Sequence, residues 1–490
     1  MLPEPGNKKK YILLACLLFL VLFGRAQSSL IFYSTEDQFN SSNFNPAFLT
    51  SQKNFTFSIF PLSGMSVGYN NQDVVRDMLM KVLRGDSIKD AMTEVFNQLV
   101  QRGVFYQRFE SSLLNFGVDT KYGNFNFRIK EIEQLMSNLK GDFSDFITDP
   151  NYNTLFINRP QKFPMNMIYY REYSLGYARE IIPHKLSVGV RAKLYYGKFT
   201  ASSGVQGELT KVNNNFYLNT SGSVKLSIPL NIVQTPSDSI ITGGNLADNF
   251  KAGDFLLNTK NRGVGIDLGF KYILNDELTI SASIIDLGKI SWKNNLNTVN
   301  YVGKYRFPDE YTDTEATGND HITKQPSFAQ DTTFMTNALF KASISHEAFS
   351  NPLPAVVYGA IQYQLNPKLN IGLVDRYIRF KGMSFNSISV TGTFNWGKNI
   401  TVNTGYSIIG NSYFNFPFGI VRNSEKGQFY IGTDNLLSFV LPGIHEFSGI
   451  TFGTCFYLFR KNEKYLKRLE YLPFYERKKA KPNKSRGLVF

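Results

Sequence analysis

The chain has 490 residues and a formal net charge of +14, and it contains 43 Phe and 27 Tyr against 2 Trp. No run of 18 or more apolar residues follows the N-terminal segment, which excludes a helical membrane protein. Residues 460–490 hold 11 Lys or Arg and 3 Glu. Because the positive charge is concentrated in this tail, it does not indicate a nucleic-acid-binding protein.

The N-terminus has the pattern of a secretory signal peptide, which we predict over residues 1–26. Lysines at positions 8–10 are followed by an apolar run over residues 11–23. This run is too short for a stable membrane anchor, and the small residue Ala26 marks the expected cleavage site. A lipoprotein box ending at Cys16 is the alternative.

Residues 262–292, RGVGIDLGFKYILNDELTISASIIDLGKISW, have apolar residues at every second position on both sides of Asn275-Asp276. A period of two puts the apolar set on one face of a strand and the polar set on the other. Two such runs joined by a short Asn/Asp turn predict an antiparallel hairpin. Residues 185–197 alternate in the same way. Their apolar set comprises Leu186, Val188, Val190, Ala192, Leu194 and Tyr196.

Long alternating segments recur along the chain and predict an all-β fold, a transmembrane antiparallel β-barrel of about 14–16 strands over residues 52–459. The count is about 16 with a weak hairpin at 204–229 included, and fourteen is the alternative. Short connections alternate with long ones, and outer-membrane barrels have short periplasmic turns and long outer loops. We therefore expect a protein of the cell outer membrane, with the short turns and the basic tail at 460–490 in the periplasm. The short turns are near Tyr122-Gly123, Pro183-His184, Asn275-Asp276, Asn366-Pro367, Gly397-Lys398 and Asn423-Ser424.

Two stretches between predicted strands, residues 72–100 and 131–147, have a helical spacing of apolar residues. Such helical inserts would either cap or plug the barrel, or pack over its rim. In the second stretch the shared face would comprise Ile132, Leu135, Met136 and Leu139.

Residues 27–51, between the signal peptide and the first strand, contain Asn45-Pro46-Ala47. Pro46 fixes its own φ angle and favours an extended Asn45. The tripeptide is either a turn before the first strand or part of a periplasmic plug segment folded into the barrel mouth as a hatch.

If the apolar strand faces contact lipid, the charged residues on the opposite faces line the lumen. These charges would either pair with one another across a closed lumen or line a polar pore. The candidate lumen-lining residues are Arg191, Lys193, Asp267, Lys271 and Glu277.

The sequence carries no recognisable catalytic, cofactor-binding or metal site. None of the four histidines has a metal-ligand spacing such as H-E-x-x-H, and no G-x-S-x-G or phosphate loop occurs. Gly85-Asp86-Ser87 is better explained as a helix cap than as a hydrolase nucleophile. Once the signal peptide is removed Cys455 stands alone, so we predict no disulfide framework. We expect neither an enzyme nor a cofactor.

The central hairpin, the segment YREYSLGYAREIIPHKLSVGVRAKLYYGKF and the late segment FYIGTDNLLSF resemble a family of uncharacterised outer-membrane barrels from Bacteroidota, known only as a domain of unknown function. Asn45-Pro46-Ala47 is also similar to the hatch region of the long-chain fatty-acid transporter family and of the type IX secretion shuttle barrel. This second resemblance implies a 14-stranded barrel with an N-terminal plug.

Three functions are compatible with these observations. The first is passage or uptake of small hydrophobic molecules, with outer-membrane lipid and a small hydrophobic solute as partners. The second is a non-transporting structural barrel of a surface or type IX secretion-linked assembly, which would present the loops at 230–261 and 293–350 to an envelope protein. A barrel enzyme is the third. We expect the first function.

Overall fold

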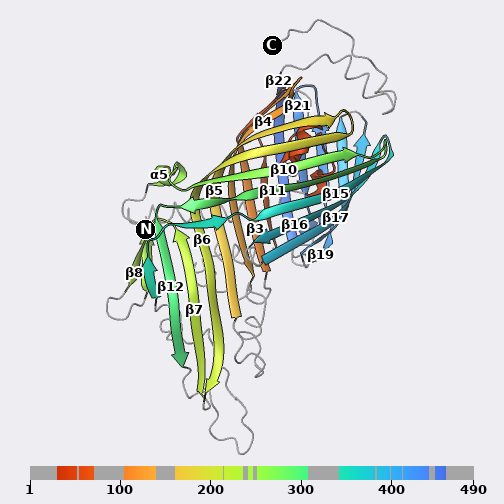
Figure 1. The fold of residues 1–490 in the computed structure, drawn as a ribbon. Helices are drawn as coiled ribbons and strands as arrows, with labels where there is room; N and C mark the ends of the chain where they lie inside the picture. The colour runs from red at the N-terminus through yellow and green to blue at the C-terminus, as the bar shows by residue number, and fades with distance from the viewer. Residues whose placement is uncertain are drawn as a thin grey trace, which may run out of the picture.

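The computed structural model describes residues 30–51, 55–70, 104–138, 161–212, 215–234, 241–246, 251–306, 342–380, 383–397, 399–410, 412–440 and 447–458. This part of the chain is almost entirely antiparallel β-sheet, with one sheet of 20 strands and a separate two-stranded sheet (Figure 1). None of its helices is long and apolar enough to cross a membrane.

The strands differ greatly in length, and the helical pieces are short. The strands are β1 Phe55–Ile59, β2 Met65–Asn70, β3 Val104–Thr120, β4 Gly123–Asn138, β5 Gln161–Ile182, β6 Leu186–Val212, β7 Asn215–Ser227, β8 Leu230–Gln234, β9 Ile241–Leu246, β10 Arg262–Ile273, β11 Leu278–Trp292, β12 Leu296–Arg306, β13 Ala342–Ser345, β14 Phe349–Pro352, β15 Ala355–Asn366, β16 Leu369–Phe380, β17 Met383–Trp396, β18 Ile400–Ile409, β19 Ser412–Asn415, β20 Phe418–Asn423, β21 Gly427–Thr433 and β22 Phe447–Leu458. The helical pieces are η2 Leu30–Phe32, η3 Ser41–Asn43, η4 Pro46–Ser51, α5 Ala252–Leu256 and α7 Leu437–Val440.

The main sheet closes on itself as a ring of 14 strand positions. β1 and β2 share the first position, because each pairs with a different part of β22. β22 also pairs with β21, and this completes the ring. The order is β1/β2, β3, β4, β5, β6, β10, β11, β15, β16, β17, β18, β20, β21 and β22. The fold is therefore the predicted antiparallel barrel, and fourteen, not sixteen, is its strand number.

Burial along the ring strands is the reverse of that in a water-soluble protein. On β10, the side chain of Leu268 is 47% exposed, whereas that of Asp267 is 0% exposed. The same alternation holds on β6, where Val190 is exposed and both Arg191 and Lys193 are buried. Apolar residues outside and charged residues inside are the arrangement of a barrel with a lipid-facing surface.

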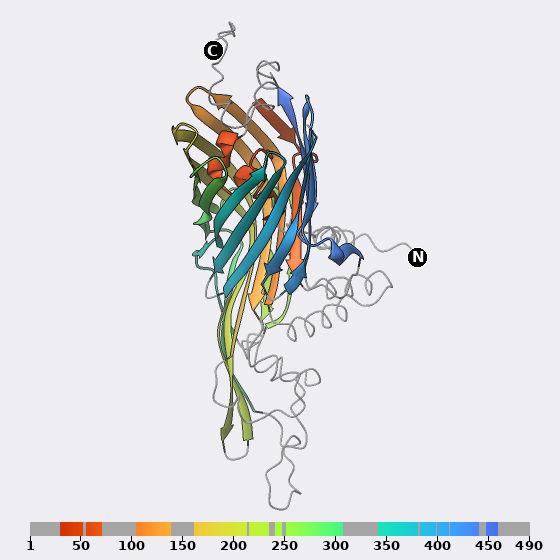
Figure 2. The same ribbon diagram turned by 90° about the vertical axis from the view of Figure 1, so that its right-hand side faces the viewer.

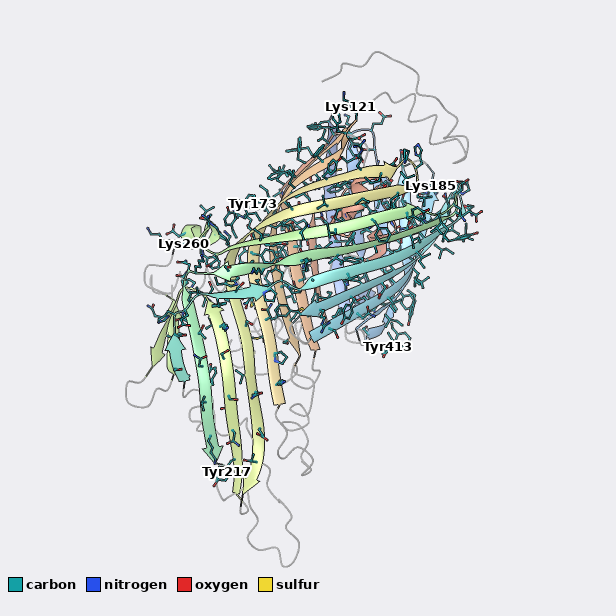
Figure 3. All side chains as sticks on the ribbon, viewed as in Figure 1. Lys121, Tyr173, Lys185, Tyr217, Lys260 and Tyr413 are labelled. Atoms are coloured by element: carbon teal, nitrogen blue, oxygen red, sulfur yellow. The ribbon has the colours of Figure 1, made fainter. Side chains whose placement is uncertain are left out.

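The short turns predicted from the sequence lie at one end of the ring. Five of the six fall wholly within the described residues, and each joins two consecutive antiparallel strands. Antiparallel neighbours alternate in direction, so turns at every second connection share one end. Figure 3 shows Lys121 and Lys185, from two of these turns, at the end opposite Tyr217.

A β-sheet extension continues beyond the other end of the ring. β6 pairs with β10 only as far as Tyr196 and then, from Thr200 onward, pairs with β7. β7 in turn pairs with β12, and β12 with β13. Figure 1 shows β6, β7 and β12 projecting together from the ring. The doubtful hairpin at 204–229 therefore forms, but outside the ring, which is why the count of sixteen was too high.

The root of this extension is a packed core with one polar anchor. Trp292 is fully buried and lies with its ring 6.5 Å from that of Phe349. Asn261 accepts hydrogen bonds at Oδ1 from the main-chain N–H groups of Lys293 (2.8 Å) and Asn294 (3.0 Å). The Asn261 side chain thus provides the hydrogen-bond acceptor for these main-chain N–H groups at the point where β11 leaves the ring.

The predicted helix at 131–147 is wrong over the residues that the structure describes. Residues 131–138 belong to β4, which pairs with β3 and β5 throughout. Ile132 and Met136 are both buried, but a separation of four residues puts side chains on one face of a strand as well as of a helix. Residues 139–147, the predicted helix at 72–100, the signal peptide at 1–26 and the tail at 460–490 lie outside the described residues.

Candidate functional site

Residues 30–51, called the hatch segment below, lie inside the ring (Figure 2). The segment is a chain of short 3-10 helices, η2, η3 and η4, whose residues are mostly buried. Its contacts with the wall are spread over β5, β6 and β10 on one side and β17, β18 and β20 on the other. It therefore fills the lumen from wall to wall.

Asn45-Pro46-Ala47 sits on a pair of glycines in the wall. Gly189 of β6 and Gly269 of β10 are direct partners across the two strands. A Cβ on Gly189 would lie 2.3 Å from the carbonyl carbon of Pro46, and one on Gly269 would lie 2.0 Å from Oδ1 of Asn45. Only a wall without side chains at these two positions lets the hatch backbone come this close.

Hydrogen bonds from Asn45 fix the tripeptide to the wall. Its Nδ2 donates to the main-chain O of Phe270 at 3.0 Å and of Ala282 at 3.3 Å. Its Oδ1 accepts from the main-chain N–H of Ala47 at 3.0 Å, which shapes the start of η4. All three predicted hatch residues thus lie against the same part of the wall, at Gly189 and Gly269.

Further polar contacts tie the rest of the hatch segment to other parts of the ring. Thr35 Oγ1 donates to Asn403 Oδ1 at 2.8 Å, and Asn40 Nδ2 donates to Tyr430 OH at 2.9 Å. Lys271 Nζ pairs with Glu36 Oε2. These contacts are hydrogen bonds and an ion pair, so they are non-covalent and can be broken and remade.

One side of the lumen wall is apolar and aromatic. It faces the hatch side chains Leu30, Ile31, Phe32, Tyr33, Phe39, Phe44 and Phe48. The Tyr33 ring stacks on Tyr358 of β15 at 5.5 Å between centroids, and the Phe32 ring meets Tyr430 of β21 edge-on at 5.3 Å. The wall residues are drawn mainly from β15–β22 and include Tyr358, Val374, Ile378, Phe380, Phe385, Ile409, Val421, Tyr430 and Cys455.

The other side of the wall carries buried charges in a network centred on Lys193. Lys193 Nζ lies 2.6 Å from Asp286 Oδ1, 2.8 Å from Asp267 Oδ1 and 3.3 Å from Glu172 Oε2. Arg191 Nη1 lies 3.4 Å from Asp267 Oδ2. Buried charges of this kind need close partners, because each loses its hydration.

The network extends to β3 and β4. Arg108 Nη2 lies 3.4 Å from Asp286 Oδ2 and 3.3 Å from Glu110 Oε2. Lys130 Nζ lies 2.6 Å from Glu110 Oε1. Three of the five predicted lumen-lining residues, Arg191, Lys193 and Asp267, thus belong to one network. They come from the neighbouring strands β6 and β10, so they pair with one another along one wall of the lumen.

The other two predicted lumen residues lie elsewhere. Lys271 is half-buried near the hatch and contacts Glu36, away from the network. Glu277 does not line the lumen, because it lies exposed in the turn between β10 and β11, where its Oε2 accepts a hydrogen bond from Tyr363 OH at 2.7 Å. Position 277 lies between the end of β10 and the start of β11, and a turn does not keep the period of two that holds within a strand.

The sequence pattern does not predict Asp286 as a lumen-lining residue, because a β-bulge changes the direction of its side chain. The alternation of β11 puts position 286 on the apolar outer face with Ile284, but Ile285 and Asp286 are both buried. The register with β10 shifts at this point, and Asp286 has a φ of 59°. Asp267 Oδ1 accepts a hydrogen bond from the Asp286 main-chain N–H at 2.8 Å. A β-bulge turns a side chain to the other face of the sheet in this way. The alternation of apolar residues alone does not predict the bulge.

The lumen is closed in this conformation. Between the charged network, Asn43 of the hatch and Tyr358 of the apolar wall lies a cavity of about 20 Å³. This volume admits only one or two water molecules. The cavity therefore leaves room for water or a small ion, and a larger solute requires the hatch segment to move.

Comparison with known proteins gives a family and a set of distant folds. Residues 46–434 match a family described as "Family of unknown function (DUF5723)". No curated protein matches the chain. Among solved structures, a Pseudomonas aeruginosa FadL homologue has a TM-score of 0.39 and 10% identity, over 88% of this chain and 98% of that one.

Two further solved structures are similar at the same level. The TodX deltaS2S3 mutant monoaromatic hydrocarbon channel has a TM-score of 0.39 and 10% identity, covering 84% of this chain and 92% of that one. The Ralstonia pickettii toluene transporter TbuX has a TM-score of 0.36 and 10% identity, covering 85% and 92%. Similarity this low does not transfer a substrate to the chain.

Proposed function

The chain belongs to DUF5723, a family of unknown function, and we propose that it is an outer-membrane barrel for the passage of small hydrophobic molecules. The observation that carries this proposal is the hatch segment, residues 30–51. It fills the lumen of a closed ring and is held by hydrogen bonds, an ion pair and apolar packing. Such contacts can be broken and remade, so the segment can open a path that the strands already surround.

The reversed burial of the ring supports a place in a membrane. Large apolar side chains are exposed on several strands of the ring, for example Leu268 on β10, Leu373 on β16 and Val390 on β17. A soluble protein would leave this continuous apolar belt in contact with water at a large free-energy cost. Bilayer lipid removes that cost, and a closed β-ring leaves no backbone edge unpaired in it.

The apolar wall under the hatch supports a hydrophobic solute. When the hatch segment moves, Tyr358, Val374 and Tyr430 lose the apolar side chains that cover them. A hydrophobic solute would restore burial of that surface, whereas a polar solute would not. The charged network lies on the opposite wall and is largely paired within itself, so it leaves the apolar wall free to bind.

Single-channel conductance in planar bilayers tests the passage proposal. The full chain is compared with a variant that lacks residues 28–50. We expect low conductance for the full chain and a clear increase for the deletion variant. Proteoliposomes carrying each form are then tested with an uncharged apolar fluorophore and with a sugar of similar size. Preferential entry of the apolar probe supports the proposal. If neither form conducted ions or admitted the probe, the proposal would be overturned.

A non-transporting partner barrel is the second candidate, and the extension favours it. β6, β7 and β12 project beyond the ring at the end opposite the short turns. With the turns in the periplasm, the extension would stand outside the cell, where an envelope or surface protein could contact it. Val302 on β12 is 79% exposed, so it presents an apolar side chain there.

Co-purification distinguishes the two candidates. A partner that co-purifies at fixed stoichiometry with the full chain, and cross-links to a photoreactive residue at position 302, favours the partner barrel. The control position is Lys185, at the opposite end of the molecule. Equal cross-linking at both positions would count against a docking role for the extension.

A further inference from the structure

The cavity beside the hatch segment is lined by more positive than negative charge. Six cations line the cavity, together with three carboxylates, and Asp267 adds a fourth through its pairs with Arg191 and Lys193. Among the described residues the cluster therefore carries an excess of two positive charges. The cations are Arg108, Arg128, Lys130, Arg191, Lys193 and Arg376, and the lining carboxylates are Glu110, Glu172 and Asp286.

Arg128 is the clearest excess charge. It is 1% exposed, and no carboxylate of the described chain lies within ion-pair distance of it. Its Nε and Nη1 are buried without a hydrogen-bond partner in the part of the chain that the structure describes. Arginine does not give up its proton in proteins. Glu172, Asp267 and Glu110 act on this charge only from beyond ion-pair distance, so its burial favours a bound counter-charge.

Arg191 offers unused donors beside it. Its Nη1 donates to the main-chain O of Ser42 in η3 at 2.6 Å, but Nε and Nη2 have no partner within the described residues. These two atoms form one edge of the guanidinium, whose parallel N–H bonds match two oxygens of an oxyanion. They lie over Gly176 of β5, 3.3 Å and 3.5 Å from where a Cβ would be, so the side chain reaches from β6 towards β4.

The strand register brings these groups to one place. Asn126, Gly176 and Arg191 are aligned across β4, β5 and β6, and Arg128 lies two residues from Asn126 on the same face. Arg128 and Arg191 both line the cavity, so two like charges face it from β4 and β6. Ser174 stands between Arg128 and Lys193 in the register, and its buried Oγ lacks a partner in the described chain.

We propose that the lumen binds a small oxyanion of the phosphate class between Arg128 and Arg191, with Ser174 Oγ as a further donor. Two guanidiniums that line one cavity recognise a tetrahedral oxyanion better than a spherical halide, because their N–H groups are directional. The anion would neutralise the excess charge of the wall. It would also stabilise the closed state, since Arg191 holds η3 of the hatch. This inference is independent of the passage proposal, because it concerns binding alone.

Thermal unfolding of the purified full chain in detergent tests the site. Inorganic phosphate is titrated at constant ionic strength against chloride. An anion that binds the folded barrel more tightly than the unfolded chain raises the midpoint of unfolding. We expect a phosphate-dependent rise in the midpoint that chloride does not give. Monodecyl phosphate below its micellar concentration forms a second arm. A response to the alkyl ester alone identifies the source as a lipid-like headgroup, whereas a response to both identifies the free ion.

Variants separate binding from folding. Arg128→Gln should weaken phosphate binding by about tenfold or more, while its midpoint in chloride stays at or above that of the unmodified chain. Arg191→Lys keeps the charge but loses the paired donors, so it should lose the preference for phosphate over chloride. Arg179→Gln, an exposed position on the same strand β5 as Ser174, is the matched control and should respond like the unmodified chain. An unmodified chain whose midpoint ignores both phosphate compounds, or an Arg128→Gln variant with an unchanged response, would overturn the proposal.

Discussion

Asn45 in the hatch segment donates a hydrogen bond from Nδ2 to the main-chain O of Phe270 in β10, at a distance of 3.0 Å. The bond is possible because the neighbouring position in the wall is Gly269, where a Cβ would lie 2.0 Å from Asn45 Oδ1. Closure of the lumen therefore depends on close contact between Asn45 and a wall position that has no side chain. Substitutions in the wall next to Asn45 should therefore displace the hatch segment although its own sequence is unchanged.

Gly189→Ala should displace the hatch. The added Cβ would lie 2.3 Å from the carbonyl carbon and 2.5 Å from the main-chain O of Pro46. Backbone atoms cannot move aside as a flexible side chain can, so we expect the free energy of the closed state to rise by about 1–3 kcal/mol relative to the open state. Single-channel recording should show a higher open fraction than in the unmodified chain.

The matched control for this change is Gly359→Ala. Gly359 is also a strand glycine of the ring, on β15, but a Cβ there meets nothing within 4 Å. It should leave the conductance unchanged. If Gly189→Ala had the same conductance as this control, close contact at the two glycines would not be what holds the hatch segment in place.

Lys193→Met should destabilise the ring strongly. Lys193 is within 3.3 Å of carboxylate oxygens from Glu172, Asp267 and Asp286. Removing the cation leaves buried carboxylates short of a partner, which costs about 3–5 kcal/mol. Unfolding in denaturant, followed by the loss of heat-modifiable migration in gels, measures the effect. Lys185→Met, at an exposed turn position, is the control and should change stability by less than about 0.5 kcal/mol. Equal midpoints for the two variants would contradict a structural role for the network.

The fold was predictable because the alternation in β6 and β10 is strict. Apolar residues such as Leu268 face outward, and Arg191, Lys193 and Asp267 face inward, as a period of two requires. The separation of Ile132 and Met136 was ambiguous, because four residues fit both a strand and a helix. Only the pairing with β3 and β5, which is set by long-range register, decides between them.

The site was predictable only in part. Asn45, Pro46 and Ala47 stand out locally because of proline, but Gly189 and Gly269 become a seat only when β6 and β10 pair in one register. Asp286 reaches the lumen through a bulge that shifts the alternation by one. Both features depend on strand pairing between distant segments, and a single sequence does not specify that pairing.

Trp292→Ala should loosen the extension and leave the ring intact. Trp292 is fully buried at the root of the extension, and a Cβ on Gly197 would lie 2.6 Å from its ring. Truncation of a buried Trp costs about 3–5 kcal/mol. Limited proteolysis should therefore cut β7 or β12 faster, while heat-modifiable migration of the ring is retained. Trp396→Ala removes the other tryptophan, which is 69% exposed, and should leave the digestion pattern unchanged. Simultaneous loss of both ring and extension would mean that the extension is not a separate packing unit.

Leu268→Arg tests whether the outer face of the ring contacts lipid. Leu268 is 47% exposed in the middle of β10, and its neighbours on the same face, Ile266 and Phe270, are exposed as well. In water, an arginine at an exposed position would change stability by less than about 0.5 kcal/mol. In lipid, it should destabilise the barrel by about 2–4 kcal/mol at the midplane and less near the interfaces. Val302→Arg is the matched control, because Val302 is 79% exposed but lies on β12 of the extension, beyond the ring. We expect folding into lipid vesicles, measured by denaturant titration, to be weakened for Leu268→Arg and unchanged for Val302→Arg. An equal and small effect of the two substitutions would show that water, not lipid, surrounds the ring.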